Sequence, residues 1–211
     1  MSSHRGNLFV ISAPSGAGKT SLVHGLLECV DSISASVSHT TRGIRPGETD
    51  GEDYFFVDDA AFRTMIDAGD FLEHAEVFGN LYGTSVSQIH RTLDSGTDLI
   101  LEIDWQGGRS VRERYPDTVS IFILPPSEAT LRQRLVGRGR DDDETIEQRM
   151  RAAVSEMSHY AEYEYLLVND DFDEALAALR SIVVASRLKT PIQLKRLAPV
   201  VGELLASLGD I

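Results

Sequence analysis

The sequence is poor in cysteine, in lysine and in long apolar segments. Cys29 is the only cysteine, so a scaffold held together by disulfides within the chain is excluded. No apolar run approaches the roughly 18 residues that span a bilayer, and the N-terminus lacks the layout of a signal peptide. We therefore expect a protein of the reducing cytoplasm that has no membrane partner.

Basic residues as a whole are scarce: 20 Lys and Arg stand against 33 Asp and Glu, which gives a formal net charge of −13. A chain this acidic is a poor binder of nucleic acid. Lys19 is the only lysine before Lys189, and several arginines fall in one stretch, at positions 132, 134, 138, 140, 149 and 151. Cations concentrated in this way indicate a site for a compact anion such as phosphate.

The order of the expected elements indicates an α/β fold. An apolar strand at 8–12 leads through a glycine-rich turn into a helix. Residues 34–84 carry short alternating segments, turn signals and one short helix from Asp58, which is typical of a small mixed lobe. The remaining elements are a helix at 86–94, a strand at 98–103, a helix at 106–114, a strand at 119–124, a helix from Ser127, a polar loop at 138–143, a long helix to about 160, a strand at 166–168 and a helix at 172–188. This alternation predicts a parallel sheet with helices on both faces.

The glycine-rich turn fits the Walker A pattern G-x-x-x-x-G-K-[ST], except that Ala13 stands at the first position. Gly16 and Gly18 allow the backbone to turn successive N–H groups toward one phosphate. Lys19 would neutralise the outer phosphates, and Thr20 would offer its hydroxyl to Mg²⁺ at the helix N-terminus. The structural alternative is a glycine turn that only reverses the chain. A dinucleotide-binding fingerprint is weak here, because its third glycine is absent from position 21.

Ten short segments follow one another in order along residues 6–188. They are APSGAGKT at 13–20, SVSHTTR at 36–42, RPGE at 45–48, GEDYFFV at 51–57, FLEHA at 71–75, GNLYGT at 79–84, IDWQG at 103–107, ILPPS at 123–127, GRG at 137–139 and VNDD at 168–171. Together they resemble the bacterial guanylate kinase family of nucleoside monophosphate kinases. Two positions depart from the family pattern: Ala13 replaces the first Walker glycine, and Glu102 stands where the family usually has Asp.

The resemblance implies a parallel sheet of the P-loop NTPase type, flanked by helices, with an inserted mixed α+β lobe that binds a nucleoside monophosphate and with a helical lid. The chain would be a single domain, with its core at about 6–33, 85–126 and 160–188, the lobe at about 34–84 and the lid at about 127–159. The tail at 189–211 is expected to be helical, and nothing in the sequence assigns it a role.

The implied reaction moves the γ-phosphoryl group of ATP to GMP, and also to dGMP, with Mg²⁺. The acceptor is a phosphate whose second pKa is about 6, so it is mostly dianionic at pH 7. No general base is then required. The enzyme must instead overcome the repulsion between two polyanions and hold them in line, and cations gathered at one site meet that need.

The resemblance also implies which residues bind GMP. A carboxylate can accept from both N1–H and the N2 amino group of guanine, and a hydroxyl can serve O6. Glu73 and Ser38 match the positions for these roles, with Thr84 and Asp104 alongside. The positions for the acceptor phosphate hold two arginines and two tyrosines: Arg42, Arg45, Tyr54 and Tyr82. Without the resemblance, Glu73 would be interpreted as an exposed strand residue, the arginines as surface and the tyrosines as core.

ATP would bind along the Walker loop, on Ala13, Pro14, Ser15, Gly16, Ala17, Gly18, Lys19 and Thr20. Asn169 matches the contact to the adenine, although an asparagine after a strand is also a common turn former. The resemblance makes Lys19, Arg134, Arg138 and Arg149 the catalytic cations around the transferred phosphoryl group. Thr20 would be the protein ligand of the Mg²⁺ ion, with Asp104 near it.

Two rival functions make different demands on the sequence. A phosphotransferase of the same fold with another acceptor would keep the Walker loop but lose the base-reading set, and Ser38, Glu73 and Tyr82 together argue against it. A guanylate-kinase-like module that binds phosphopeptides would lack a working Walker loop, whereas Lys19 and Thr20 are present. Four further residues show no metal-ligand spacing and are expected to be structural: Cys29, His39, His74 and Trp105. Whether the chain forms a homo-oligomer stays open.

Overall fold

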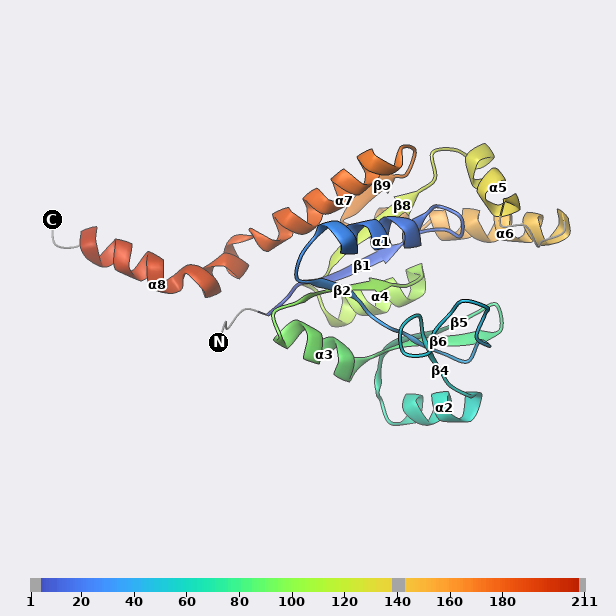
Figure 1. The fold of residues 1–211 in the computed structure, drawn as a ribbon, viewed down its shortest axis with the longest axis horizontal. Helices are drawn as coiled ribbons and strands as arrows, with labels where there is room; N and C mark the ends of the chain where they lie inside the picture. Colours follow the sequence, from blue (N-terminus) through green and yellow to red (C-terminus); the bar gives the residue numbers. More distant parts are fainter. Residues whose placement is uncertain (1–4, 138–142, 209–211) are drawn as a thin grey trace.

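The computed structural model describes residues 5–137 and 143–208, and its centre is a parallel sheet with helices on both faces (Figure 1). Within these residues the sheet has five strands, in the order β2 (Ile33–Ala35), β7 (Asp98–Glu102), β1 (Leu8–Ser12), β8 (Val119–Leu124) and β9 (Tyr165–Val168). Each neighbouring pair runs parallel. The α/β fold with a parallel sheet is thereby confirmed.

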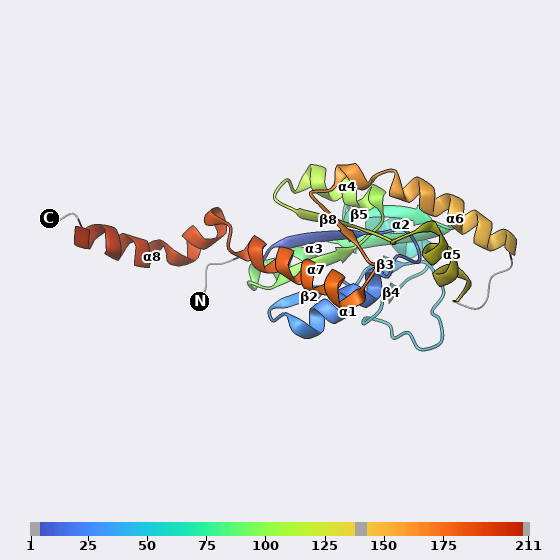
Figure 2. The same cartoon turned by 90° about the horizontal axis from the view of Figure 1, so that it is seen from above.

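Two helical layers enclose the sheet because its central strands are apolar on both faces. Phe9 and Ile11 pack with α1 (Lys19–Cys29) and α7 (Phe172–Arg187), whereas Leu8 and Val10 point to the other face, toward α3 (Val86–Asp94) and α4 (Trp105–Arg114). Figure 2 shows α7 and α1 together on one side of the strands. In such a sheet the polar loops at the carboxyl ends of the strands form the natural crevice for a ligand.

A second, smaller sheet is formed by strands of the mixed lobe expected at 34–84. Its strands lie in the order β4 (Phe55–Phe56), β3 (His39–Thr40), β6 (Asn80–Ser85) and β5 (Phe71–Val77), with β3 and β4 parallel and the other pairs antiparallel. The helix expected from Asp58 is α2 (Asp59–Asp67), and the Asp58 carboxylate caps it by accepting from the Ala61 N–H. The hairpin between β5 and β6 turns at Phe78 and Gly79, both of which have positive φ.

A pair of helices lies at one end of the sheet and a long terminal helix extends from the other (Figures 1 and 2). Helices α5 (Glu128–Val136) and α6 (Asp143–Met157) share a small apolar core of Leu131, Leu135, Ile146, Met150 and Ala153. A short 3-10 helix, η1 (Tyr160–Glu162), connects α6 to β9. Helix α8 (Thr190–Leu208) projects away from the body of the molecule.

Candidate functional site

The Walker loop has the backbone conformation that its glycines predict. It connects β1 to α1, and Gly16 and Gly18 have φ values of 92° and 93°, in the left-handed region that favours glycine. A Cβ atom on Gly18 would lie only 2.3 Å from the Asn169 Nδ2 atom, so this position also requires close approach. Thr20 lies exposed in the first turn of α1. The loop therefore presents backbone N–H groups and a helix N-terminus at the carboxyl edge of the sheet.

Two side chains from distant parts of the chain hold the Walker loop in place. Asn169, which is buried, donates from Nδ2 to the Ala17 carbonyl at 2.7 Å. Arg134 donates to the same carbonyl at 3.2 Å and to the Asn169 carbonyl at 3.1 Å. Asn169 is thus a brace of the loop in this structure, and not only the turn former that its position after a strand allows. These two residues also line a hollow that Gly16, Gly18, Ser21, Gly137, Asp170 and Phe172 complete.

Lys19 lies among three carboxylates. Burial lowers the pKa of its ammonium group, while Glu102, Asp104 and Glu156 act in the opposite direction. A polyanion that entered this space would meet Lys19 and the loop N–H groups as attractive partners and the carboxylates as repulsive ones. The arrangement suits a phosphate chain that arrives with a cation.

A single cavity of about 350 Å³ connects the Walker loop to the small sheet. Its walls come from four parts of the fold: the loop with the start of α1, the small sheet with the residues beside it, the carboxyl end of β7, and the last turn of α6. The lining residues are Ala13, Pro14, Ser15, Gly16, Gly18, Lys19, Thr20, Ser21, Ser38, Tyr54, Glu73, Ala75, Val77, Phe78, Tyr82, Glu102, Ile103, Asp104 and Glu156. Most of the expected site residues therefore lie together.

Glu73 is the buried acidic group of this cavity. It is 7% exposed on β5 and accepts a hydrogen bond from Thr84 Oγ1 at 2.6 Å, and Thr84 Oγ1 lies 3.4 Å from Ser38 Oγ. Burial raises the pKa of the Glu73 carboxyl to about 7, an effect that the Thr84 hydroxyl opposes and the nearby Asp104 carboxylate reinforces. A buried carboxyl with one hydroxyl partner is prepared to accept hydrogen bonds from a ligand.

Tyr54 and Tyr82 stand edge to face with ring centroids 6.0 Å apart, and burial raises the pKa of the Tyr54 hydroxyl. The Arg42 guanidinium lies 5.2 Å from the centre of the Tyr54 ring. It is ion-paired with Glu48 at 2.8 Å, which raises the pKa of Arg42 and lowers that of Glu48. Arg45 is exposed on the neighbouring loop and is not among the described residues that line the cavity.

Asp104 lines the cavity and also caps a helix. It is the N-cap of α4, where its Oδ1 accepts from the Gly107 N–H at 2.9 Å. A Cβ atom on Gly107 would lie 2.8 Å from Glu73 Oε2, so the first turn of α4 packs directly against the Glu73 carboxyl. The two acidic side chains are therefore fixed relative to each other by one helix end.

Of the three arginines expected to act from α5, α6 and the loop between them, the structure describes two. Arg134 holds the Walker loop as described, and Arg149 is half-buried on α6. Arg138 lies outside the described residues, as does Arg140. Arg132 and Arg151 are exposed, and Arg132 forms an ion pair with Glu147 at 2.6 Å that connects α5 to α6.

Sequence reasoning missed Glu156. This residue is near the C-terminal end of α6, lines the cavity, and accepts from the backbone N–H of Ser15 at 3.2 Å. Burial raises the pKa of its carboxyl, whereas the Ser15 N–H bond and Lys19 lower it and Asp104 raises it further. Its one sequence signal is a seven-residue spacing from Arg149, which puts both on one face of a helix.

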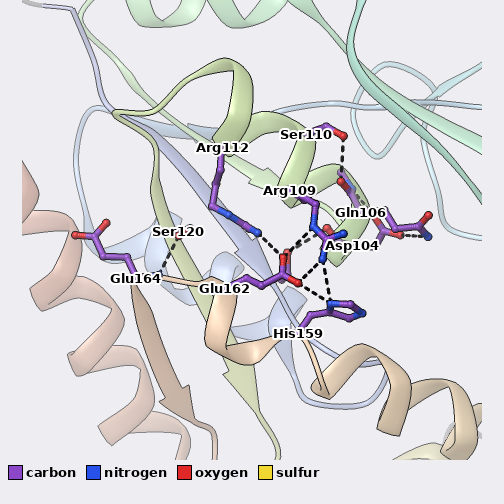
Figure 3. Close-up of polar contacts among 11 residues, drawn as sticks. Asp104, Gln106, Arg109, Ser110, Arg112, Ser120, His159, Glu162 and Glu164 are labelled. Carbon is purple, nitrogen blue, oxygen red and sulfur yellow. Dashed lines mark hydrogen bonds and ion pairs between the residues drawn. The ribbon is translucent and has the colours of Figure 1, made fainter.

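A charged cluster joins η1 and the residue before it to α4 (Figure 3). Glu162 accepts from Arg109, from Arg112 at 2.9 Å and from His159 at 2.7 Å. These bonds, the Arg109 bond above all, lower the pKa of the Glu162 carboxyl to about 2. The His159 ring stacks on Trp105 with centroids 3.6 Å apart, which gives Trp105 the structural role expected for it. The cluster therefore anchors η1, the segment that follows α6, to the helix that Asp104 caps.

The family model described as guanylate kinase matches residues 5–186. The guanylate kinase of Alkalilimnicola ehrlichii is 59% identical over 203 residues, which cover 96% of this chain and 98% of the relative. That of Legionella pneumophila is 51% identical over 207 residues and covers 98% and 99%. The crystal structure of guanylate kinase from Anaplasma phagocytophilum matches with a TM-score of 0.74 at 38% identity over 89% of each chain. Among the described residues, no helix is both long and apolar enough to cross a membrane.

Proposed function

The chain belongs to the guanylate kinase family, and from this premise we propose how its own residues transfer the γ-phosphoryl group of ATP to GMP, forming ADP and GDP. The observation that carries the proposal is the single cavity that has the Walker loop at one end and the buried Glu73 at the other. Two nucleotides bound at its two ends would meet with their phosphates between them. In-line transfer needs this arrangement.

At the acceptor end, Glu73 accepts from N1–H and the N2 amino group of guanine, and Ser38 and Thr84 complete the polar edge. Adenine presents the reverse pattern at these positions and would leave the carboxylate without donors. Tyr54, Tyr82, Arg42 and Arg45 bind the GMP phosphate. Three of the five N–H groups of Arg42 already bond to Glu48 and Gly43, so the phosphate uses the other two or displaces Glu48. These contacts use the base and the phosphate, and dGMP is therefore a substrate as well.

At the donor end, the backbone N–H groups of residues 13–20 bind the ATP phosphates and Lys19 neutralises the charge that develops on transfer. Arg134, Arg138 and Arg149 surround the transferred group, and Asn169 supports the adenine side. ATP brings Mg²⁺, which neutralises phosphate oxygens when bound. The exposed Thr20 hydroxyl would be its protein ligand, and the carboxylates of Glu102 and Asp104, which line the same cavity, are hard oxygen donors that would suit this ion.

No residue acts as a general base, because the acceptor phosphate is already dianionic at neutral pH. The chain instead positions the two substrates and excludes water, which would otherwise compete as acceptor. The lobe at about 34–84 and the lid at about 127–159 close over GMP and ATP for this purpose. The reaction takes place in the cytoplasm, in keeping with a single unpaired cysteine.

A coupled assay of ADP formation from ATP tests the proposal, with GMP, dGMP, AMP and UMP as acceptors. We expect GMP and dGMP to be preferred by roughly 10³-fold or more, since a site with buried hydrogen-bonding groups rejects a base that leaves them unpaired. Equal rates with AMP would contradict the role of Glu73. Loss of activity with all four acceptors would favour a binding module. Small-angle scattering should also show compaction with a bisubstrate analogue, and an unchanged radius would contradict closure.

A further inference from the structure

A carboxylate of the chain itself occupies part of the phosphate cradle. The backbone N–H of Ser15 donates to Glu156 Oε2 at 3.2 Å, although the two residues are 141 positions apart in the chain. Ser15 belongs to the Walker loop, and Glu156 to the helix α6 that packs beside it. Backbone N–H groups of such a loop are the donors that phosphate oxygens need. Glu156 therefore satisfies one of them in place of a ligand.

The surroundings of Glu156 make it a good stand-in for a phosphate oxygen. Its side chain is half-buried in the same cavity as Lys19, and the two attract each other. From β7 and its following turn, Glu102 and Asp104 face the same lysine. We propose that Glu156 is a positioning residue that fills the phosphate cradle when ATP is absent and leaves it when the ATP phosphates bind. The inference rests on the proposed role of the Walker loop as the ATP phosphate site.

The exchange follows from charge and from hydrogen-bond capacity. A single N–H cannot serve a carboxylate and a phosphate oxygen equally well, and the two anions repel each other at contact distance. The carboxylates at Glu102 and Asp104 add to that repulsion unless a cation is present. ATP binding must therefore displace the Glu156 carboxylate from the Ser15 N–H.

The exchange is connected to the catalytic arginines because Glu156 lies on α6, which packs against α5. Helix α6 shares an apolar core with α5, and the Arg132–Glu147 ion pair connects the same two helices. Helix α5 carries Arg134, and Arg149 lies seven residues before Glu156 on the same face of α6. The exchange at Ser15 thus connects phosphate binding to the position of both arginines.

Glu156→Gln tests the proposal, since it keeps the size and a carbonyl acceptor but removes the charge. Isothermal titration with ATP and with tripolyphosphate, without GMP, measures the cradle directly. We expect Kd for both ligands to fall about tenfold, as for one like charge removed near contact. In steady-state assays KM for ATP should fall and KM for GMP should stay. The matched control is Glu113→Gln, the same charge change at an exposed position of α4, which should leave both Kd values unchanged.

Unchanged or weaker binding of tripolyphosphate to a folded Glu156→Gln variant would overturn the proposal. So would a structure with ATP bound in which Glu156 still accepts from the Ser15 N–H. Wild-type protein that forms no ADP with GMP would contradict the proposed function instead. Tripolyphosphate still tests the exchange in that event, because it needs only the cradle.

Discussion

Replacing Glu73 with Gln should make the protein more stable and less able to select its acceptor. The wild-type carboxyl is 7% exposed, and it accepts from Thr84 Oγ1 at 2.6 Å. Burial raises its pKa from 4.5 to about 7, and the Asp104 carboxylate adds to the shift. The fold therefore opposes ionisation of Glu73, while recognition of guanine requires the ionised form.

The size of the stability effect follows from the pKa shift. In the unfolded chain the carboxyl ionises near pH 4.5, whereas in the folded chain it keeps its proton up to about pH 7. Stability from this group is thus fully present below pH 4.5 and is lost as the pH rises to 7, to a total of about 3 kcal/mol. Glu73→Gln has no such loss. Its unfolding free energy should equal that of the wild type near pH 4 and exceed it by up to about 3 kcal/mol above pH 7, a rise of several degrees in Tm.

Whereas Glu73→Gln should raise the stability, it should lower the selectivity for GMP. The glutamine amide introduced at position 73 keeps one acceptor oxygen but turns an NH₂ donor toward the donors of guanine. We expect kcat/KM for GMP to fall roughly 30- to 1,000-fold, the equivalent of about 2–4 kcal/mol. Activity with AMP should change far less, so the GMP/AMP ratio should collapse, and Kd for ATP should stay the same. Wild-type KM for GMP should improve as pH rises through about 7, and the variant should lack that component.

Denaturant unfolding between pH 4 and 8, together with the coupled assay, measures both effects on one preparation. The matched control is Glu76→Gln, an exposed position on the same strand, which should alter neither property. Equal losses of GMP and AMP activity, accompanied by a lower unfolding free energy, would refute the reasoning. Glu73 would then support the lobe and not read the base.

Three further predictions concern other parts of the fold. Lys19→Met should fold normally and lose roughly 10³-fold or more in kcat, because the transition state loses a positioned cation; more than a tenth of the wild-type rate would contradict this. Asn169→Ala should weaken ATP binding and cost about 1 kcal/mol of stability, since Arg134 still serves the Ala17 carbonyl; unchanged ATP affinity by titration would argue against the brace. Arg187→Met should cost roughly 3 kcal/mol in unfolding experiments, because it removes the 2.7 Å partner of the buried Asp98 carboxylate, and should leave kcat unchanged at the far end of the sheet; a loss in kcat would refute that separation.

The sequence specified local structure well. The helix expected at 86–94 and the strand expected at 119–124 have those bounds as α3 and β8, and the helix expected at 106–114 begins one residue earlier, at Trp105. The Walker loop was also predicted, since its strand, glycines and helix are contiguous. Hydrophobic periodicity and backbone sterics act over a few neighbouring residues. A short stretch of sequence is therefore enough to predict a helix, a strand or a glycine turn.

The side-chain contacts of the site could not be predicted from short stretches of sequence. Asn169 bonds to Ala17 across 152 residues, and Glu156 bonds to Ser15 across 141. The resemblance assigned Asn169 to the nucleotide, but only the folded chain has it holding the loop. The only sequence signal of Glu156 is its seven-residue spacing from Arg149, and a glutamate at that spacing in a charged helix is ordinary on a surface. Which helix faces which loop depends on strand order and packing, and these are properties of the whole chain.

The sequence by itself determined the α/β architecture, the phosphate loop and the acidic, cation-poor character of the chain. Tertiary structure alone decided the ionisation of the site. Glu73 lies on a strand on which the next residue, His74, is exposed. Packing in the folded chain, in which the first turn of α4 approaches its carboxyl, buries Glu73 and brings its pKa to about 7. Burial and the distance between charges are set by elements far apart in sequence. The affinity of a carboxyl for its proton is therefore fixed only once those elements have come together.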